Sequence, residues 1–350
     1  METYVSDLEQ AVITYYGLPW PEVDEAAYPP LVAALNAYAQ FTLDDGWAAH
    51  RHMQRLTSSG QGEALTALWE HWVRVMDQDM APVAKSANAL ATTVNEFPSV
   101  IVTLKQTIAY EAHQLAARNV ISEAGGVLTF GAAEAAAARD ADATRRQAAQ
   151  QVQQAASTLR QSLKALLADP SVAALETVPS DLSGGVGGGA IAAGAGVAGA
   201  GSGGAAGGVA GGAGGGAAGG VAGGASAGDA RHSGGGGGTG GDLAGSTGIR
   251  VDHDEHKLAA SRIASVSDDV LGRTSAELAT ATSQHATARG SGSFAEALAP
   301  DADLILDRLA AATAAIGAHL GGALPDAILL ISGDQQSTDD DNRRRMSQID

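Results

Sequence analysis

The chain has no cysteine, which excludes disulfide bonds and thiolate chemistry. It is also poor in aromatic side chains, which make up 4% of its 350 residues, although 45% of the residues are hydrophobic. Much of that apolar share is alanine, whose small side chain suits close packing between helices better than a thick enzyme core.

Positive charge is scarce as well. The chain has 21 Lys and Arg residues against 39 Asp and Glu residues, which gives a formal net charge of −18 and an isoelectric point near 4.7. Nucleic acids and anionic membrane surfaces are bound through clustered basic side chains. The charge balance therefore argues against both classes of partner.

The sequence lacks a long run of Leu, Ile and Phe, so no membrane-spanning helix is expected. Its N-terminus, "METYVSDLEQAVITYYG", carries acids where a Sec signal has a basic segment, so no Sec signal is expected either.

One long stretch, residues 184–241, consists almost wholly of glycine and alanine. Glycine at this density raises the entropy lost on ordering, so we expect a flexible linker over residues 176–248. The alternative is a glycine-zipper segment that inserts into a membrane, because small residues recur there at four-residue spacing.

Residues 1–175 have the pattern of helices almost throughout, with a break at "SSGQG", residues 58–62. Pro82 is expected to kink the helix that follows the break. Absence of a convincing strand pattern argues against parallel-sheet enzyme folds. The apolar side chains after the break recur at i, i+3, i+4 and i+7, as on one buried helix face: Leu65, Leu68, Trp69, Trp72, Val73 and Met76.

Residues 249–350 predict an antiparallel helical hairpin that turns at residues 290–293 and ends in a polar, acidic tail. Two helices alone bury too little apolar area to offset their ordering entropy, so the hairpin should need another helical surface. That surface could be a second copy, a separate hairpin protein or the N-terminal bundle. The residues expected at this contact are Leu258, Val266, Leu298, Ile305, Leu309 and Ile316.

Trp20 stands between Pro19 and Pro21, which fix the backbone on both sides of the indole. We expect the ring to lie across the chain's own helices, with presentation to a partner as the alternative. Asp24 and Glu25 should cap the next helix.

Two groups of residues could carry chemistry. "DHDEH", residues 252–256, could hold a divalent metal through His253 and His256, but we expect an acidic helix start with Asp252 as its N-cap. "HRH", residues 50–52, is expected to be a solvated face. No nucleophile elbow, phosphate loop or zincin helix is present, so we expect no catalytic residue, no cofactor and no metal.

The strings "GLPWPEVDE", "SSGQGEAL" and "LWEHW" resemble the helical N-terminal domain of actinobacterial type VII secretion effectors. These effectors are relatives of the small WXG-type hairpin proteins, and a similar domain precedes the toxin in CpnT-like proteins. The resemblance covers residues 10–165. It departs from the small hairpin proteins at the turn, where Gly60 and Gly62 flank Gln61 with no Trp-x-Gly motif.

The C-terminal region, residues 249–346, is similar to the EspC-like family of secretion-associated proteins in its "RVD" start and its "TDDDN" tail. In related substrates a tyrosine stands four residues before an acid as part of the export signal. Here Ser337 occupies that place before Asp341, so the tyrosine is missing.

Together these features predict an all-α protein: a WXG-like helical bundle over residues 1–175, a glycine-rich linker, and an EspC-like hairpin over residues 249–350. The resemblance implies a non-enzymatic type VII secretion substrate or secretion-associated protein that acts through helix faces. Its partner would be a WXG-type or EspC-like protein, a second copy or the secretion machinery. It would be secreted by this Sec-independent route, or cytoplasmic before export. The alternatives are a membrane-active protein and a non-exported, chaperone-like or antitoxin-like partner. Besides the hairpin residues named above, the expected interface includes Trp20, Trp69 and Trp72.

Overall fold

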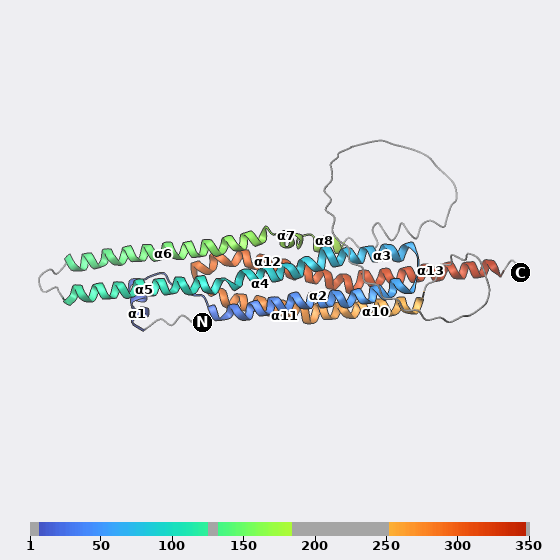
Figure 1. The fold of residues 1–350 in the computed structure, drawn as a ribbon, viewed down its shortest axis with the longest axis horizontal. Helices are drawn as coiled ribbons and strands as arrows, with labels where there is room; N and C mark the ends of the chain where they lie inside the picture. Colours follow the sequence, from blue (N-terminus) through green and yellow to red (C-terminus); the bar gives the residue numbers. More distant parts are fainter. Residues whose placement is uncertain (1–6, 125–131, 184–251, 348–350) are drawn as a thin grey trace, which may run out of the picture.

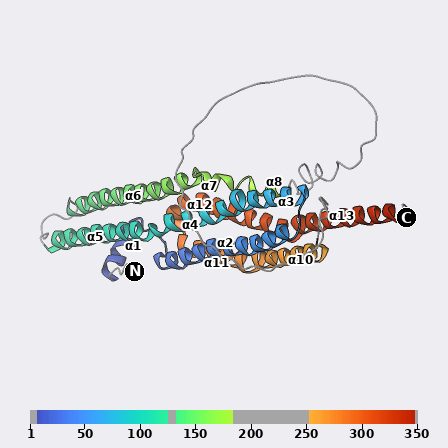
Figure 2. The same cartoon turned by 45° about the vertical axis from the view of Figure 1, so that its right-hand side comes forward.

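The computed structural model describes residues 7–124, 132–183 and 252–347. Every regular element in these ranges is a helix, so the all-α prediction is confirmed. The long helices lie nearly parallel to one axis and form an elongated rod, which both views show (Figures 1 and 2). The expected linker at residues 184–248 lies outside the described ranges.

The first helix, α1 (Asp7–Tyr16), stops at Gly17, which adopts a positive φ of 58°. The chain then runs in extended form past Trp20 to the short 3₁₀ turn η1 (Glu25–Ala27). As predicted, Asp24 is the N-cap of this turn, and its side chain accepts a hydrogen bond from the Ala26 amide.

A long hairpin follows, formed by α2 (Tyr28–Ser59) and by a return arm of three consecutive helical segments. Its turn lies at residues 60–62, where the glycine pattern placed it. The return arm contains a π-helical stretch directly before Pro82, which occupies the first turn of the next helix. The segments are α3 (Glu63–Arg74), η2 (Val75–Met80) and α4 (Ala81–Asn95).

The next two helices, α5 (Phe97–Ala124) and α6 (Ala132–Leu167), pair with each other and extend past the rest of the rod at one end (Figure 1). Two short helices, α7 (Pro170–Ala174) and α8 (Val178–Ser183), follow. The prediction that the linker begins at residue 176 was wrong. Apolar side chains of α8, four residues apart, are buried where it packs on α12.

The C-terminal region forms the predicted helical hairpin, in which each arm contains a short π-helical stretch. The hairpin turns at Gly290, which has a positive φ of 61°. A Cβ at this position would lie 1.6 Å from the Glu22 carbonyl oxygen, so the turn packs directly on the N-terminal chain. The first arm is α10 (His253–Asp269), η3 (Val270–Thr274) and α11 (Ser275–Arg289); the second is α12 (Gly292–Ala318), η4 (His319–Ala323) and α13 (Leu324–Met346).

The hairpin formed by α10–α13 lies on the N-terminal helices and shares one hydrophobic core with them. Helix α2 packs against α10 and α11, while α12 packs against α4, α6 and α8. Of the three surfaces that could cover the hairpin, the structure has the chain's own N-terminal helices. We call this interface between α1–α8 and α10–α13 the seam.

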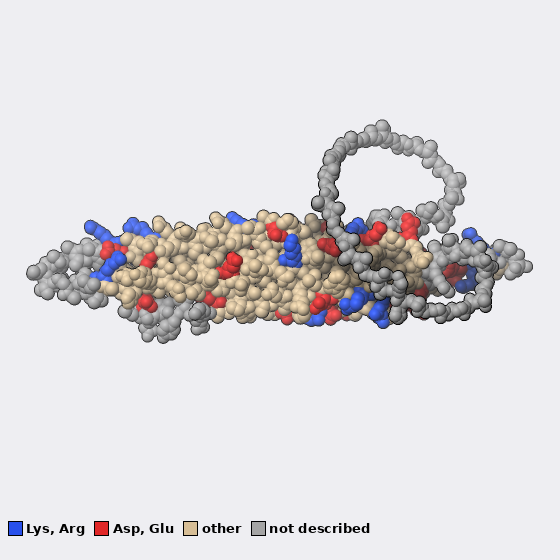
Figure 3. Space-filling view, viewed as in Figure 1, with Lys and Arg blue, Asp and Glu red and all other residues tan. Residues whose placement is uncertain are grey.

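Charged side chains are sparse along the face of the rod seen in Figure 3, with wide uncharged areas between them. The final part of α13 projects beyond the other helices (Figure 1), and most of its side chains from Gly333 onward are exposed.

Candidate functional site at the seam between the two halves

The seam buries most of the residues that the helical spacing pointed to. Five of the six predicted contact residues of the hairpin are buried in the shared core: Val266, Leu298, Ile305, Leu309 and Ile316. Leu258 was a wrong prediction, since 41% of it is exposed. The buried face of α10 passes through His256, Ala259 and Ile263. Leu258 lies roughly 200° around the helix from His256.

Asp45, on α2, is the most deeply buried charged group of the seam, with only 2% of its side chain exposed. Its Oδ1 accepts a hydrogen bond from Nη2 of Arg273 at 2.6 Å. Its Oδ2 accepts one from Oγ1 of Thr274, also at 2.6 Å. Burial raises the pKa of Asp45, and the bonds from Thr274 and Arg273 oppose that rise.

A second buried contact across the seam joins Tyr38 of α2 to Thr313 of α12, with 2.6 Å between their hydroxyl oxygens. Thr313 donates its own proton to the carbonyl of Leu309, so the Tyr38 hydroxyl is the donor in this pair. Burial raises the pKa of Tyr38 to about 12. Together with Asp45, this pair sets how α2 lies along the hairpin.

A third contact joins two imidazoles, with 3.1 Å between Nε2 of His71 on α3 and Nε2 of His319 in η4. Burial, and then the neighbouring His71, lower the pKa of His319 to about 4. Burial and the charge of Arg74 lower the pKa of His71 as well. Both rings are therefore neutral at pH 7, and the Nε2 of one donates its proton to the Nε2 of the other.

Three of the four tryptophans gather next to this histidine pair. Trp72 is fully buried and donates its Nε1 proton to Nδ1 of His50 at 3.2 Å. The His50 ring lies between Trp47 and Trp69, with centroid distances of 5.3 and 5.1 Å. Trp69 is partly buried, whereas 53% of Trp47 is exposed. The predicted site residues Trp69 and Trp72 therefore lie together, close to the seam.

A groove of about 470 Å³ opens beside this aromatic cluster, along the outer face of α3. It is lined by the apolar side chains of Ala67, Trp69 and Val73, and by the acid Glu70 and the base Arg74. Trp69 thus contributes both to the cluster and to an open surface of the protein.

Trp20 does not reach this site. Its ring packs against the core, and the Nζ of Lys105 on α5 lies 5.7 Å from the ring centroid. That Nζ forms a 2.8 Å ion pair with Glu25 and donates to the Val23 carbonyl at 2.8 Å. Trp20 therefore lies over the chain's own helices, and its presentation to a partner stays a prediction.

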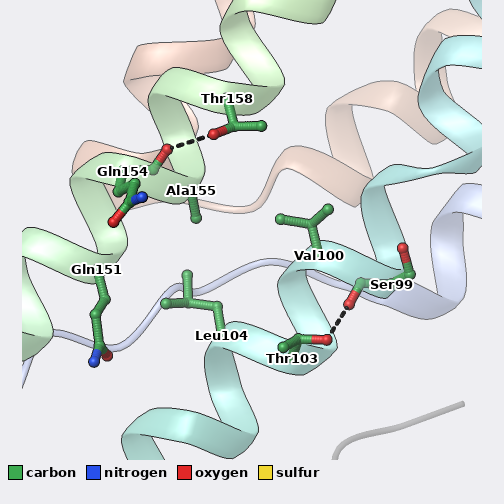
Figure 4. Close-up of a pocket in the computed structure, with 8 residues that line it drawn as sticks. All are labelled: Ser99, Val100, Thr103, Leu104, Gln151, Gln154, Ala155 and Thr158. Atoms are coloured by element: carbon green, nitrogen blue, oxygen red, sulfur yellow. Dashed lines mark hydrogen bonds between the residues drawn. The ribbon is translucent and has the colours of Figure 1, made fainter.

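A second groove, of about 380 Å³, lies between α5 and α6 (Figure 4). Its hydroxyl groups are used by their own helices, because Thr103 donates to the Ser99 carbonyl and Thr158 to the Gln154 carbonyl. The groove therefore presents few free polar groups to a ligand.

The histidines considered for a metal have separate partners. His253 contacts the Ser332 hydroxyl at 2.8 Å, and His256 contacts the Asp252 carbonyl at 2.9 Å. Asp252 is the N-cap of α10, as predicted. Over residues 7–124, 132–183 and 252–347, no three His, Asp, Glu or Cys side chains gather as a metal site would require.

Sequence reasoning did not identify the polar contacts of the seam. One signal was available for Asp45, because it interrupts an otherwise regular stripe of α2. The buried positions of that stripe are Tyr38, Thr42, Asp45, Ala49, Met53 and Leu56. A charged residue at helical spacing among buried positions indicates a buried partner, but the pattern does not say which residue that partner is.

One helical stretch, residues 292–345, is long and apolar enough to cross a membrane by length and composition alone. Half of its most apolar window is buried inside the protein, as expected for a core helix. This stretch comprises α12, η4 and α13, the second arm of the hairpin.

The resemblance to type VII secretion proteins stays a prediction after wider comparison. Comparison with protein-family models, with curated proteins and with solved structures finds no match. The structure adds the arrangement of the helices, in which one chain supplies both sides of a helical interface.

Proposed function

We propose that the chain is a non-enzymatic substrate of a type VII secretion system, or a helical protein associated with that machinery, and that it carries its own partner hairpin. The observation that supports this most directly is the seam. The C-terminal hairpin covers α2, α4, α6 and α8 with the side chains that a separate hairpin protein would otherwise use.

The apolar area that the hairpin buries supports the same proposal. A two-helix hairpin buries too little apolar surface to be stable alone, and here α2, α4, α6 and α8 cover that surface within one chain. The folded unit would then be ready for export without a second hairpin protein. The surface that contains Trp47 and Trp69 stays accessible in this arrangement, and there a component of the machinery would bind.

The test is cell fractionation in a host that has a type VII system, with the full chain carrying an epitope tag. We expect the protein in the culture medium when the system's ATPase is active, and only in the cells when the ATPase is inactivated. A cytosolic enzyme measured in the same fractions controls for lysis. Equal amounts in the medium of both strains would overturn the proposal.

The tail of α13 allows a second, more specific test of the same proposal. Ser337 and Asp341 are both exposed there, and Ser337→Tyr would restore the tyrosine-to-acid spacing of related substrates. If the machinery reads this helix, export should rise with Ser337→Tyr and stay at the wild-type level with Ser337→Phe, which adds a ring without the hydroxyl.

A further inference from the structure

We infer that the buried contact of Asp45 with Arg273 and Thr274 makes the N-terminal helices selective for a hairpin that presents an arginine and a hydroxyl at consecutive positions. In this protein that partner is its own C-terminal hairpin. The inference deepens the proposed function by naming what the seam recognises.

Selectivity follows from the cost of a mismatch. The Asp45 carboxylate is 2% exposed, and its hydrogen bonds are those from Arg273 and Thr274. A hairpin with apolar side chains at these two positions would leave a buried carboxylate without donors, which is strongly unfavourable. A hairpin with acids there would add repulsion. Either mismatch favours dissociation.

The two donors approach Asp45 in different ways. Thr274 is buried and reaches the carboxylate with its short side chain. The Arg273 side chain is 48% exposed and approaches from the rim, with its guanidinium 4.4 Å from the Phe41 ring centroid. Recognition thus requires one long cationic and one short hydroxyl side chain, together with Phe41 on α2.

The carboxylate cannot easily turn away from this contact, because the neighbouring backbone is held closely. A Cβ at Gly46 would lie 3.0 Å from the Met76 sulfur and 3.2 Å from the Met80 sulfur. This part of α2 therefore packs directly on η2, which fixes the position from which Asp45 extends.

The other ion pairs across the seam are poor candidates for selection. Arg160 and Asp301 form a pair at 2.9 Å in which 14% of the acid side chain is exposed, against 2% for Asp45. Arg308 and Glu176 form another at the surface. Solvent-exposed pairs of this kind contribute little, so a mismatch at either costs little.

The test compares matched and mismatched sides within the full-length chain. Asp45→Leu removes the acceptor, Arg273→Met with Thr274→Val removes the donors, and a triple variant combines all three changes. Urea unfolding is followed by circular dichroism for these three proteins and for the wild type. We expect each mismatched protein to lose at least about tenfold in its folding equilibrium constant. In the triple variant apolar side chains face each other at this contact, so its urea midpoint should return to the wild-type value or exceed it.

Arg160→Met, Asp301→Leu and their combination form the matched control, with an expected change below about threefold for every member. Mismatched variants as stable as the wild type would overturn the inference. So would a triple variant that loses as much as the two mismatches together. A mismatched variant that fails to fold, beside a triple variant that folds, is the expected result in its strongest form. The measurement needs no secretion machinery, so its failure is distinguishable from failure of export.

Discussion

His71 and His319 meet across the seam with 3.1 Å between their Nε2 atoms, so one of the contacts that hold the hairpin is a hydrogen bond between two imidazole rings. The His319 ring is buried, and its Nδ1 has no hydrogen-bond partner among the described residues. A proton on the accepting Nε2 would place two donors face to face, and a proton on the donating ring would leave a positive charge in this largely buried site.

We therefore expect stability to fall in acid. Because the pKa of His319 is lowered from 6.5 to about 4 in the folded protein, the unfolded chain binds a proton first. The contribution is complete above about pH 6.5 and is lost as the pH falls toward 4, by up to about 3 kcal/mol. Urea unfolding at several pH values measures it. His319→Gln should flatten this part of the profile, whereas His113→Gln, at an exposed site on α5, should leave it as in the wild type.

Asp79 predicts a pH dependence of the opposite sign. This buried carboxylate of η2 has its pKa raised to about 6, first by burial and then by the charge of Asp181 on α8. Its ionisation therefore destabilises the protein as the pH rises from 3.8 through 6. We expect Asp79→Asn to raise the free energy of unfolding at pH 8 by up to about 3 kcal/mol. The same change should have no stabilising effect at pH 4.

The exposed neighbour Asp77 provides a matched control for that experiment. Asp77→Asn should change stability at pH 8 by no more than about 0.5 kcal/mol. If Asp79→Asn instead destabilises the protein at pH 8, the carboxylate has a favourable partner and its pKa is not raised.

Substitutions in the aromatic cluster should cost much stability at a buried ring and little at an exposed one. Trp72→Ala should destabilise the protein by about 3–5 kcal/mol, because the ring is fully buried. Trp47→Ala, in the same cluster but 53% exposed, should cost about 1 kcal/mol or less. Thermal unfolding of the two variants measures the difference. Similar losses of stability for both variants would contradict the difference in burial between the two rings.

Two glycines of the hairpin turn form a second matched pair. Gly290 and Gly292 both have positive φ, so alanine is strained at either position. At Gly292 nothing lies within 4 Å of the added Cβ, whereas at Gly290 it would collide with the Glu22 carbonyl. We expect Gly292→Ala to cost about 1 kcal/mol and Gly290→Ala about 3 kcal/mol or more. Equal costs would mean that the turn does not rest on Glu22.

The shared core predicts how the protein behaves after it is cut. A protease site inserted within residues 184–251 and cleaved in the folded protein should leave two fragments that co-elute as one particle. Their association depends on the seam, so Leu309→Asp should separate them, since Leu309 is fully buried there. Fragments that separate without this substitution would show that the seam is weak.

Much of the fold could be predicted from local chemistry. The breaks at residues 58–62 and at Gly290 follow from glycine, and the buried faces of α3 and α12 follow from the spacing of Leu, Trp and Ile. The partner of each face could not, because an apolar stripe fits many other stripes equally well. Leu258 shows the limit on one helix. The buried face of α10 includes a histidine and two alanines beside Ile263 and Val266, and Leu258 lies outside it.

The polar contacts of the seam could not be predicted from the sequence for a related reason. Asp45 and Thr274 are separated by 229 positions, and nothing local to either residue identifies the other. The same holds for His71 and His319, at a separation of 248. Such pairs become visible only when the packing of whole helices is known.

The hairpin follows the N-terminal helices in the sequence, and this order has a consequence during synthesis. Helix α8 ends at Ser183 and α13 ends at Met346, so roughly 160 residues must be added before the seam can close. At about 5–20 residues per second, the N-terminal helices wait on the order of ten seconds or more at the ribosome. During that interval the Asp45 carboxylate and the apolar face of α2 have no intramolecular cover from the hairpin. A nascent chain stalled just after residue 183 should therefore bind holding chaperones and hydrophobic dyes more strongly than the released protein.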